Sequence, residues 1–311
     1  VAQNMGTLGT DAALKLMYNS MLSAPATHVV NNMSNAFNVV YRPLTAMVGG
    51  NAKAKKAAIA SYHNFFKTIP EAFELAMRTG KTGISNVGGS RDLVQQGQTT
   101  AALKELSQRA AESNNIALKA GSGFIHMLHD VANFPLFSWP ERFLTTSDEF
   151  FKVMVTRMEF NRFQMEKAID LAGSEGESAV EETFKRLLKS EYSRNFTKSG
   201  GLLNDELLKG AKEVTFQTDL EGAAGKFASF LNDVPALRVF FPFVKTGHNV
   251  LVYTGTHIPV LNLALKESRE VLLQDTFEGA VMRGRLAFGT MTVLGAATLA
   301  TQGLITGNGP A

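Results

Sequence analysis

Two short motifs carry residue types that could bind a metal ion or a nucleotide. His126 and His129 stand three residues apart on a predicted helix, so both imidazole rings can share one helix face. Gly80-Lys81-Thr82 matches the end of a phosphate-binding loop, whose backbone amides and lysine hold nucleotide phosphates. However, the histidines lack further ligands at a metal-site spacing, and Leu75 occupies the position of the loop's first glycine. We therefore expect packing roles for the histidines and no nucleotide at Gly80.

Two Glu-Ser pairs, Glu177-Ser178 and Glu267-Ser268, match the dipeptide in which lytic transglycosylases carry their catalytic acid. Neither pair has the tyrosine-rich, cleft-building surroundings that such a site requires. The chain also contains no cysteine, which excludes disulfides, thiolate metal ligands and cysteine nucleophiles. No catalytic constellation emerges, so we expect a chain that is not an enzyme and holds no cofactor or metal.

The charge balance is close to neutral, with 31 Lys and Arg against 28 Asp and Glu and a formal net charge of +3. Residues 1–135 are weakly basic, with 12 basic and 7 acidic side chains. This is not the dense basic stripe of a dedicated nucleic-acid reader. Lys53, Lys55 and Lys56 on one predicted helix could meet DNA phosphates without reading bases. An ordinary solvated helix face is the simpler explanation for these lysines.

The sequence predicts that nearly all of the chain, including the candidate residues above, is helical. Apolar residues recur at helical spacing almost throughout, and alternating strand patterns are scarce. The sequence therefore predicts an all-α protein: an elongated bundle of many helices broken by Pro and Gly, with an apolar carboxy-terminal helix. We divide it into an amino-terminal helical group at 1–132, a central group at 133–233 and apolar helices at 234–311. Because the chain begins with Val1, not Met, we expect it to be a segment of a longer polypeptide.

Local patterns predict how two of these helices begin and end. One helix gathers apolar side chains on a single face and should end near Arg42-Pro43, because proline disfavours a helix interior. Residues 133–144, with two prolines and several aromatics, suggest a rigid buried corner between helical groups. A capping-box spacing from Thr146 to Glu149 marks the start of the clearest helix. The apolar face of the first helix consists of Val29, Met33, Phe37 and Val40.

Charged residues within the second helix have the spacings of ion pairs. Glu159–Arg162 and Arg162–Glu166 are three and four residues apart. Such pairs are typical of a solvated helix face, and we expect that role here. Gly173 is a natural stop for this helix, since glycine is favoured just past a helix end.

No Asp, Glu, Lys or Arg occurs after Arg285, and residues 286–306 of this uncharged end are mainly apolar. As a helix they would rise about 30 Å, the thickness of a bilayer's hydrocarbon core. Leu286, Leu294, Leu299 and Ile305 would then lie within the membrane, with Arg283 and Arg285 as anchors in the headgroup layer. Thr290, Thr292, Thr298, Thr301 and Gln302 dilute the apolar residues of the segment. A helix buried inside a protein assembly is therefore the alternative interpretation.

Four stretches in order resemble a region of the large internal virion proteins of short-tailed bacteriophages, also found in other large multi-domain phage proteins. The similarity extends over nearly the whole chain, although each stretch by itself consists mainly of residues that begin or end helices and of apolar residues that pack. The stretches are MLSAPATHVVN at 21–31, SDEFFKVMVTRMEF at 147–160, PFVKTGHNVLVYTGTHIP at 242–259 and QGLITGNGP at 302–310.

This resemblance implies a structural role in genome delivery. Proteins of this kind are stored in the capsid interior, in a core on the portal, and pass into the host cell envelope to form a conduit for DNA. The implied partners are other internal virion proteins, the portal, further copies of the chain, the host membrane and phage DNA without sequence preference. A membrane-active α-helical protein, such as a pore-forming toxin or an envelope-remodelling factor, is the alternative. A hydrolase of peptidoglycan or nucleic acid is the least favoured class.

Overall fold

The computed structural model describes residues 14, 16–82, 84–88, 135–233, 237 and 243–305, together with Glu112, Lys119, Ser122, Gly123, His126 and Met127. Every regular element in these ranges is a helix, which confirms the all-α prediction. His129 and residues 89–100 lie outside the described residues. In chain order the helices are α2 (Pro25–Gly49), α3 (Ala52–Ser61), α4 (Phe65–Thr82), α7 (Pro135–Ala172), η1 (Gly173–Glu175), α8 (Glu177–Ser190), α9 (Tyr192–Asn195), η2 (Asp205–Leu207), α10 (Leu208–Val214), α11 (Gly222–Asp233), α12 (Val244–His257), α13 (Pro259–Ala264), α14 (Lys266–Leu272) and α15 (Phe277–Thr301).

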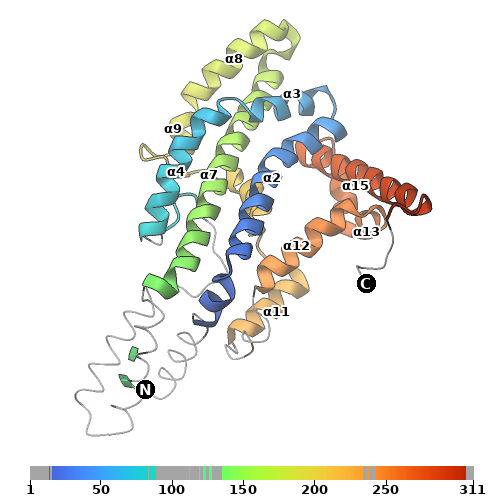
Figure 1. The fold of residues 1–311 in the computed structure, drawn as a ribbon. Helices are drawn as coiled ribbons and strands as arrows, with labels where there is room; N and C mark the ends of the chain where they lie inside the picture. The colour runs from blue at the N-terminus through green and yellow to red at the C-terminus, as the bar shows by residue number, and fades with distance from the viewer. Residues whose placement is uncertain are drawn as a thin grey trace.

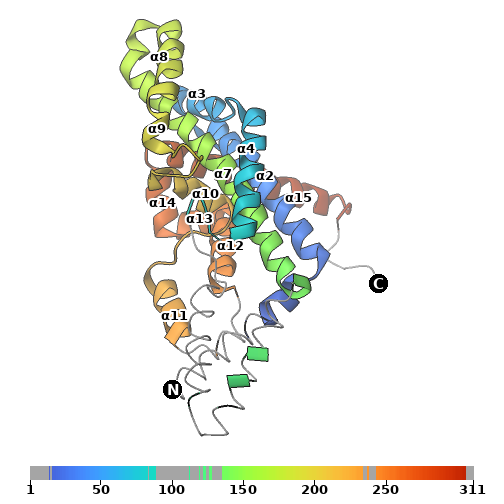
Figure 2. The ribbon, with the colours of Figure 1, turned by 90° about the vertical axis from the view of Figure 1, so that its left-hand side faces the viewer.

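Helix α7 is the central element of the fold. It packs against α3, α4, α8 and α10, while α2 packs along α15. Figures 1 and 2 show α4 beside α7 and α8 folding back at one end of α7. Leu75 of α4 meets Val153 and Met154 of α7 in a buried cluster, and Phe184 joins α8 to the far end of α7 in another. Burying a side chain of this size stabilises the fold by about 1.5–3 kcal/mol. Helices from all three predicted groups therefore pack on one another.

Helix α7 begins earlier than the sequence predicts. Residues 135–144 form its first turns instead of a corner, and Pro135 opens the helix, where proline is well tolerated. The capping-box prediction is also wrong, because the Thr146 hydroxyl donates to the Arg142 carbonyl at 2.8 Å, as a residue inside a helix does. The other end is as predicted, since α7 stops at Ala172, immediately before Gly173.

Glu149 holds the loop that follows α4, in place of the capping role predicted for it. The side chain is almost fully buried. Its carboxylate accepts from the Ser85 hydroxyl at 2.7 Å and from the backbone amides of Asn86 and Val87 at 2.6 and 3.3 Å. Lys152 lies 3.3 Å from the same carboxylate and donates to the Gly88 carbonyl at 2.9 Å. One carboxylate thus fixes residues 85–88 against α7.

Glu149→Ala should lower the free energy of unfolding by about 2 kcal/mol, because it leaves buried donors without an acceptor. Chemical denaturation monitored by circular dichroism measures this change. Glu182→Ala is the control, since Glu182 is exposed on α8 and should stay within about 0.5 kcal/mol of the parent. Equal stability of the two variants would contradict the proposal that Glu149 holds residues 85–88 against α7.

Helix α2 does not end near Arg42-Pro43 but continues through Pro43 to Gly49. Its last turns cross α15 at very short range. A Cβ atom at Gly49 would overlap the Ala280 carbonyl oxygen, and one at Gly284 would overlap the Thr45 carbonyl oxygen. Two glycines therefore allow the backbones of α2 and α15 to touch. This crossing supports the last two turns of α2 despite the proline.

Candidate interaction surface

Helix α2 is oriented with its polar side toward the protein and its apolar side toward solvent. Asn35 and Asn38 are 1% and 4% exposed, whereas Met33 and Phe37 are 68% and 61% exposed. An amphipathic helix normally buries its apolar face. The apolar face that the sequence identifies on this helix is therefore the outer face.

Residues far away in the sequence supply hydrogen-bond partners to the buried polar side of α2, although the buried Asn35 Oδ1 atom has none among the described residues. Asn31 and Asn35 both donate to the Asp148 carboxylate, at 3.3 and 3.4 Å. Asn38 donates to the Val214 carbonyl at 3.4 Å and accepts from the Tyr253 hydroxyl at 2.9 Å. Buried amides of this kind stabilise a helix interface only when their partners are in place. The row of asparagines is thus an internal polar seam between α2, α7, α10 and α12.

Arg42 continues this seam as the centre of a charged network. Its guanidinium lies 2.5 Å from Glu159 of α7, 3.0 Å from Glu213 of α10 and 2.6 Å from Glu278 of α15. The Arg42 side chain is only 5% exposed. One arginine therefore joins four helices through charge-assisted hydrogen bonds.

Two further arginines extend the network. Arg162 lies 2.8 Å from Glu159, and Arg285 lies 2.6 Å from Glu213. The solvated-face prediction for Glu159 and Arg162 is therefore wrong, because both are buried. The predicted local pairs do form, since Arg162 lies 2.8 Å from both Glu159 and Glu166, but Glu159 also pairs with Arg42, which lies 117 positions away and was not recognisable from local spacing. Arg162 also packs on the Phe277 ring at 4.4 Å from its centroid.

The outer side of α2 is a continuous apolar stripe. Its side chains recur every three or four residues, so they line one face of the helix over its whole length. Soluble monomers rarely leave an apolar surface of this extent in water. We call it the α2 stripe; it consists of Val29, Val30, Met33, Phe37, Val40, Leu44 and Val48, each at least 40% exposed.

Other helices expose apolar side chains as well. Helix α4 presents Phe66, Ile69, Phe73 and Met77 on one outer face, opposite the side that packs on α7. Helices α12 and α13 expose Leu251, Val260 and Leu261, among others. In Figure 1 the carboxy-terminal end of α15 projects away from the other helices. These surfaces, together with the α2 stripe, are the candidate interaction surface.

The predicted membrane segment begins inside the fold and ends outside it. Leu286 is half-buried, whereas Leu294, Leu299 and Ile305 are exposed at 63%, 42% and 46%. Within the residues that the structure describes, no helix combines the length and apolar character needed to cross a membrane. Residues 291–305 are thus an exposed helix end that makes little contact with its own chain.

The two predicted headgroup anchors have structural roles instead. Arg283 donates to the Gly49 carbonyl at 2.8 Å and to the Leu272 and Gln274 carbonyls at 2.9 Å each. Arg285 is buried in the charged network with Glu213, and its guanidinium lies over the Tyr253 ring. Arg285 is thus buried, whereas Arg283 is partly exposed and is held by three backbone carbonyls.

Two of the three lysines that were predicted to contact phosphate form ion pairs with carboxylates. Lys53 lies 2.5 Å from Asp170, and Lys56 lies 3.0 Å from Glu177. Lys55 is exposed, and no ion pair of its side chain occurs among the described residues. The lysines therefore tie α3 to the end of α7 and the start of α8 and do not form an open basic patch. Exposed ion pairs of this kind contribute little stability.

One signal in the sequence could have identified the inward side of α2. Asn31, Asn35 and Asn38 recur with Arg42 at helical spacing. Asparagine is a poor helix former, so a row of asparagines on one face of a helix is unusual unless the amides find partners. No comparable local signal marks Glu213 or Glu278 as partners of Arg42.

Comparison with protein-family models, with curated proteins and with solved structures finds no match to this chain. The exposed apolar faces and the buried charged network are therefore the basis on which a function can be assigned.

Proposed function

We propose that the chain is a structural subunit of a large helical assembly, and that this assembly is the internal core and DNA-ejection conduit of a short-tailed bacteriophage. The partners would be further copies of the chain, other internal virion proteins and the portal. The location would be the capsid interior before infection and the host cell envelope afterwards. In this proposal the subunit is an elongated bundle whose apolar carboxy-terminal helix contacts neighbouring subunits.

The observation that carries the proposal is the orientation of α2. A helix that buries its asparagines and exposes Met33 and Phe37 gains no hydrophobic stabilisation from its apolar side within the chain. That side becomes favourable when another surface covers it, as in obligate assemblies with apolar interfaces. The four stretches that resemble internal virion proteins support the phage setting.

Association of the purified chain tests the assembly. We expect oligomers by multi-angle light scattering, and Met33→Lys combined with Phe37→Lys should dissociate them. Two buried side chains of this size contribute about 3 kcal/mol or more, so the dissociation constant should rise about a hundredfold. Both residues are exposed in the subunit, so the variant should keep the helical circular dichroism spectrum of the parent and lose only the stabilisation that association gives.

Leu171→Lys is the matched control, because Leu171 is exposed on α7 and lies outside the candidate interaction surface. It should associate like the parent. A monomeric parent, or an oligomer insensitive to the α2 substitutions, would reject the assembly. The phage setting is tested separately by mass spectrometry of purified particles, where absence of the chain would reject it. Residues 1–311 contain no cysteine, so Met33→Cys would place one cross-linking thiol at a known position on the α2 stripe.

A membrane-active α-helical protein is the second candidate, and the exposed end of α15 is the observation that favours it. Leu294 and Leu299 could enter the interfacial region of a bilayer without spanning it. Flotation with liposomes of neutral and anionic lipids tests this candidate. Leu294→Arg with Leu299→Arg should abolish flotation, whereas flotation that survives both changes would reject this use of α15.

A further inference from the structure

Helix α4 turns its largest apolar side chains away from the protein. It packs on α7 through a side that carries the buried residues Ala72, Leu75 and Ala76. Figure 1 shows α4 beside α7 at the edge of the bundle. On the outer side, Phe66 and Phe73 are 81% and 60% exposed, so these rings gain nothing from burial within the chain. We call this side the α4 face; it consists of Phe66, Ile69, Phe73 and Met77.

Charged residues line the helix directly beside the α4 face. They recur every three or four residues, so they form one stripe along the helix. Both carboxylates of this stripe are already paired, since Glu71 lies 2.5 Å from Arg157 of α7 and Glu74 lies 3.0 Å from Arg78. The stripe consists of Lys67, Glu71, Glu74, Arg78 and Lys81.

Lys67 and Lys81, at the two ends of the stripe, are left without a carboxylate. Both are exposed, and neither forms an ion pair with any residue that the structure describes. His63 lies near Lys67, because burial lowers the pKa of His63 and the positive charges of Lys67 and Lys185 lower it further. The α4 face is thus bordered by positive charge at both of its ends.

The α2 stripe has no such border. No Asp, Glu, Lys or Arg occurs between Pro25 and Tyr41. An uncharged apolar surface is typical of the core of a protein–protein interface. An apolar helix face bordered by lysines is instead typical of a helix that lies in the interfacial region of a bilayer, where anionic headgroups attract the lysines. The two surfaces therefore fit different partners.

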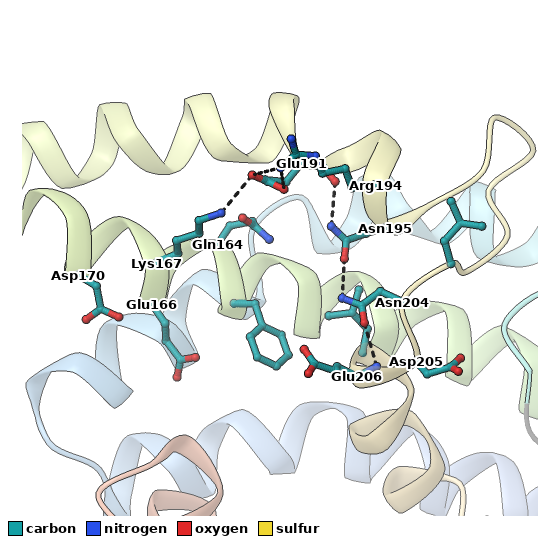
Figure 3. Close-up of a pocket in the computed structure, with 13 residues that line it drawn as sticks. Gln164, Glu166, Lys167, Asp170, Glu191, Arg194, Asn195, Asn204, Asp205 and Glu206 are labelled. Carbon is teal, nitrogen blue, oxygen red and sulfur yellow. Dashed lines mark hydrogen bonds and ion pairs between the residues drawn. The ribbon is translucent and has the colours of Figure 1, made fainter.

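The surface depression between α7, α9 and η2, of about 660 Å³, has the opposite charge. Its two cations, Lys167 and Arg194, both pair with Glu191, at 3.1 and 3.2 Å (Figure 3). Asp205 and Glu206 on its wall are exposed, and neither forms an ion pair with a described residue. Anionic headgroups would be repelled here, so this surface should face away from a bilayer.

We propose that the α4 face binds the surface of an anionic lipid bilayer, with the helix axis parallel to the membrane plane. Phe66 and Phe73 would enter the boundary between headgroups and acyl chains, while Lys67 and Lys81 would extend to the headgroup phosphates. The proposal goes beyond the assembly described above and does not depend on it, because it uses no residue of the α2 stripe or of the exposed end of α15.

Co-sedimentation of the whole chain with lipid vesicles tests the role of the lysines. We expect tighter binding to vesicles of an equal mixture of phosphatidylcholine and phosphatidylglycerol than to phosphatidylcholine alone, and high salt should reduce the difference. Lys67→Gln with Lys81→Gln should weaken binding to the mixed vesicles about thirtyfold. Lys209→Gln with Lys226→Gln removes the same charge from exposed positions on α10 and α11, so this control should bind like the parent.

A second pair of substitutions tests the apolar contact. Phe66→Ser with Phe73→Ser should weaken vesicle binding about a hundredfold, because two large side chains no longer leave water. Leu203→Ser with Leu273→Ser is the matched control, since these leucines are 57% and 81% exposed and lie outside α4. All of these side chains are exposed, so every variant should keep the helical circular dichroism spectrum of the parent.

A fluorescent label locates the contact. Residues 1–311 contain no cysteine, so Met77→Cys and Leu203→Cys can each carry one environment-sensitive fluorophore. Emission from position 77 should shift to the blue on the mixed vesicles, and emission from position 203 should not. A parent that does not bind vesicles, unchanged binding of either α4 variant, or no shift at position 77 would overturn the proposal. So would a loss of self-association in the phenylalanine variant that leaves vesicle binding intact, which would assign the α4 face to a second copy.

Discussion

Glu159→Gln should lower the free energy of unfolding by about 3–5 kcal/mol, the typical effect of removing one partner from a buried ion pair. Glu159 is buried between Arg42 and Arg162, at 2.5 and 2.8 Å. Without its charge, two guanidinium groups remain in the interior with less compensation. The measurement is urea unfolding at neutral pH.

Glu181→Gln is a stringent control, because it makes the same chemical change in an ion pair of similar length. Glu181 lies 2.6 Å from Lys185, but both side chains are more than 60% exposed. Exposed pairs four residues apart on a helix contribute little to stability, because solvent screens their charges. Equal effects of the two substitutions would show that burial of the charged network contributes nothing to stability.

The pH dependence of unfolding gives a second measurement on the same variant. Burial raises the pKa of Glu213, but the charges of Arg285 and Arg42 outweigh it and lower the pKa from 4.5 to about 2. The arginines likewise lower the pKa of the buried Glu159. Carboxylates with a lowered pKa stabilise the fold fully above pH 4.5, and this stabilisation is lost as the pH falls toward 2. The stability of Glu159→Gln should therefore fall less steeply with acid than that of the parent.

Gly284→Ala should destabilise the protein by about 3 kcal/mol, at the upper end of the usual effect of overpacking. The added methyl group would overlap the Thr45 carbonyl, which belongs to the backbone of α2 and cannot rotate away. The α2–α15 crossing would have to open. Opening would separate Arg42 of α2 from Glu278 of α15, and it would move Arg285 of α15 relative to its partner Glu213. Thermal or urea unfolding measures the loss.

Gly295→Ala is the control within the same helix. Apart from the adjacent residues and backbone of its own helix, no atom of the described residues lies within 4 Å of the position that its added methyl group would occupy. Because alanine is the better helix former, this change should stabilise the protein or leave it unchanged, by about 0.5–1 kcal/mol at most. If Gly284→Ala were as stable as Gly295→Ala, the close contact of α2 with α15 would not limit the fold.

Local sequence patterns correctly predicted that the chain is helical and that α7 ends at Ala172. Both follow from local physics: apolar residues at helical spacing favour helices, and Gly173 favours a stop. The predicted helix boundaries were wrong where the local preferences of proline competed with packing. Pro43 and Pro140 lie inside helices, because contacts along α2 and α7 outweigh the preference of proline for helix ends.

Which face of each helix is buried depends on contacts between residues that are distant in the sequence. Periodicity divides α2 into an apolar and a polar side, but it does not say which side meets the rest of the chain. The asparagine side is buried because Asp148, Val214 and Tyr253 supply its partners from distant positions. For the same reason Glu159 and Arg285, which local spacing assigns to a solvated face and a membrane boundary, lie in the interior. Burial of a charge depends on compensating charges that the fold brings together, and local spacing does not contain that information.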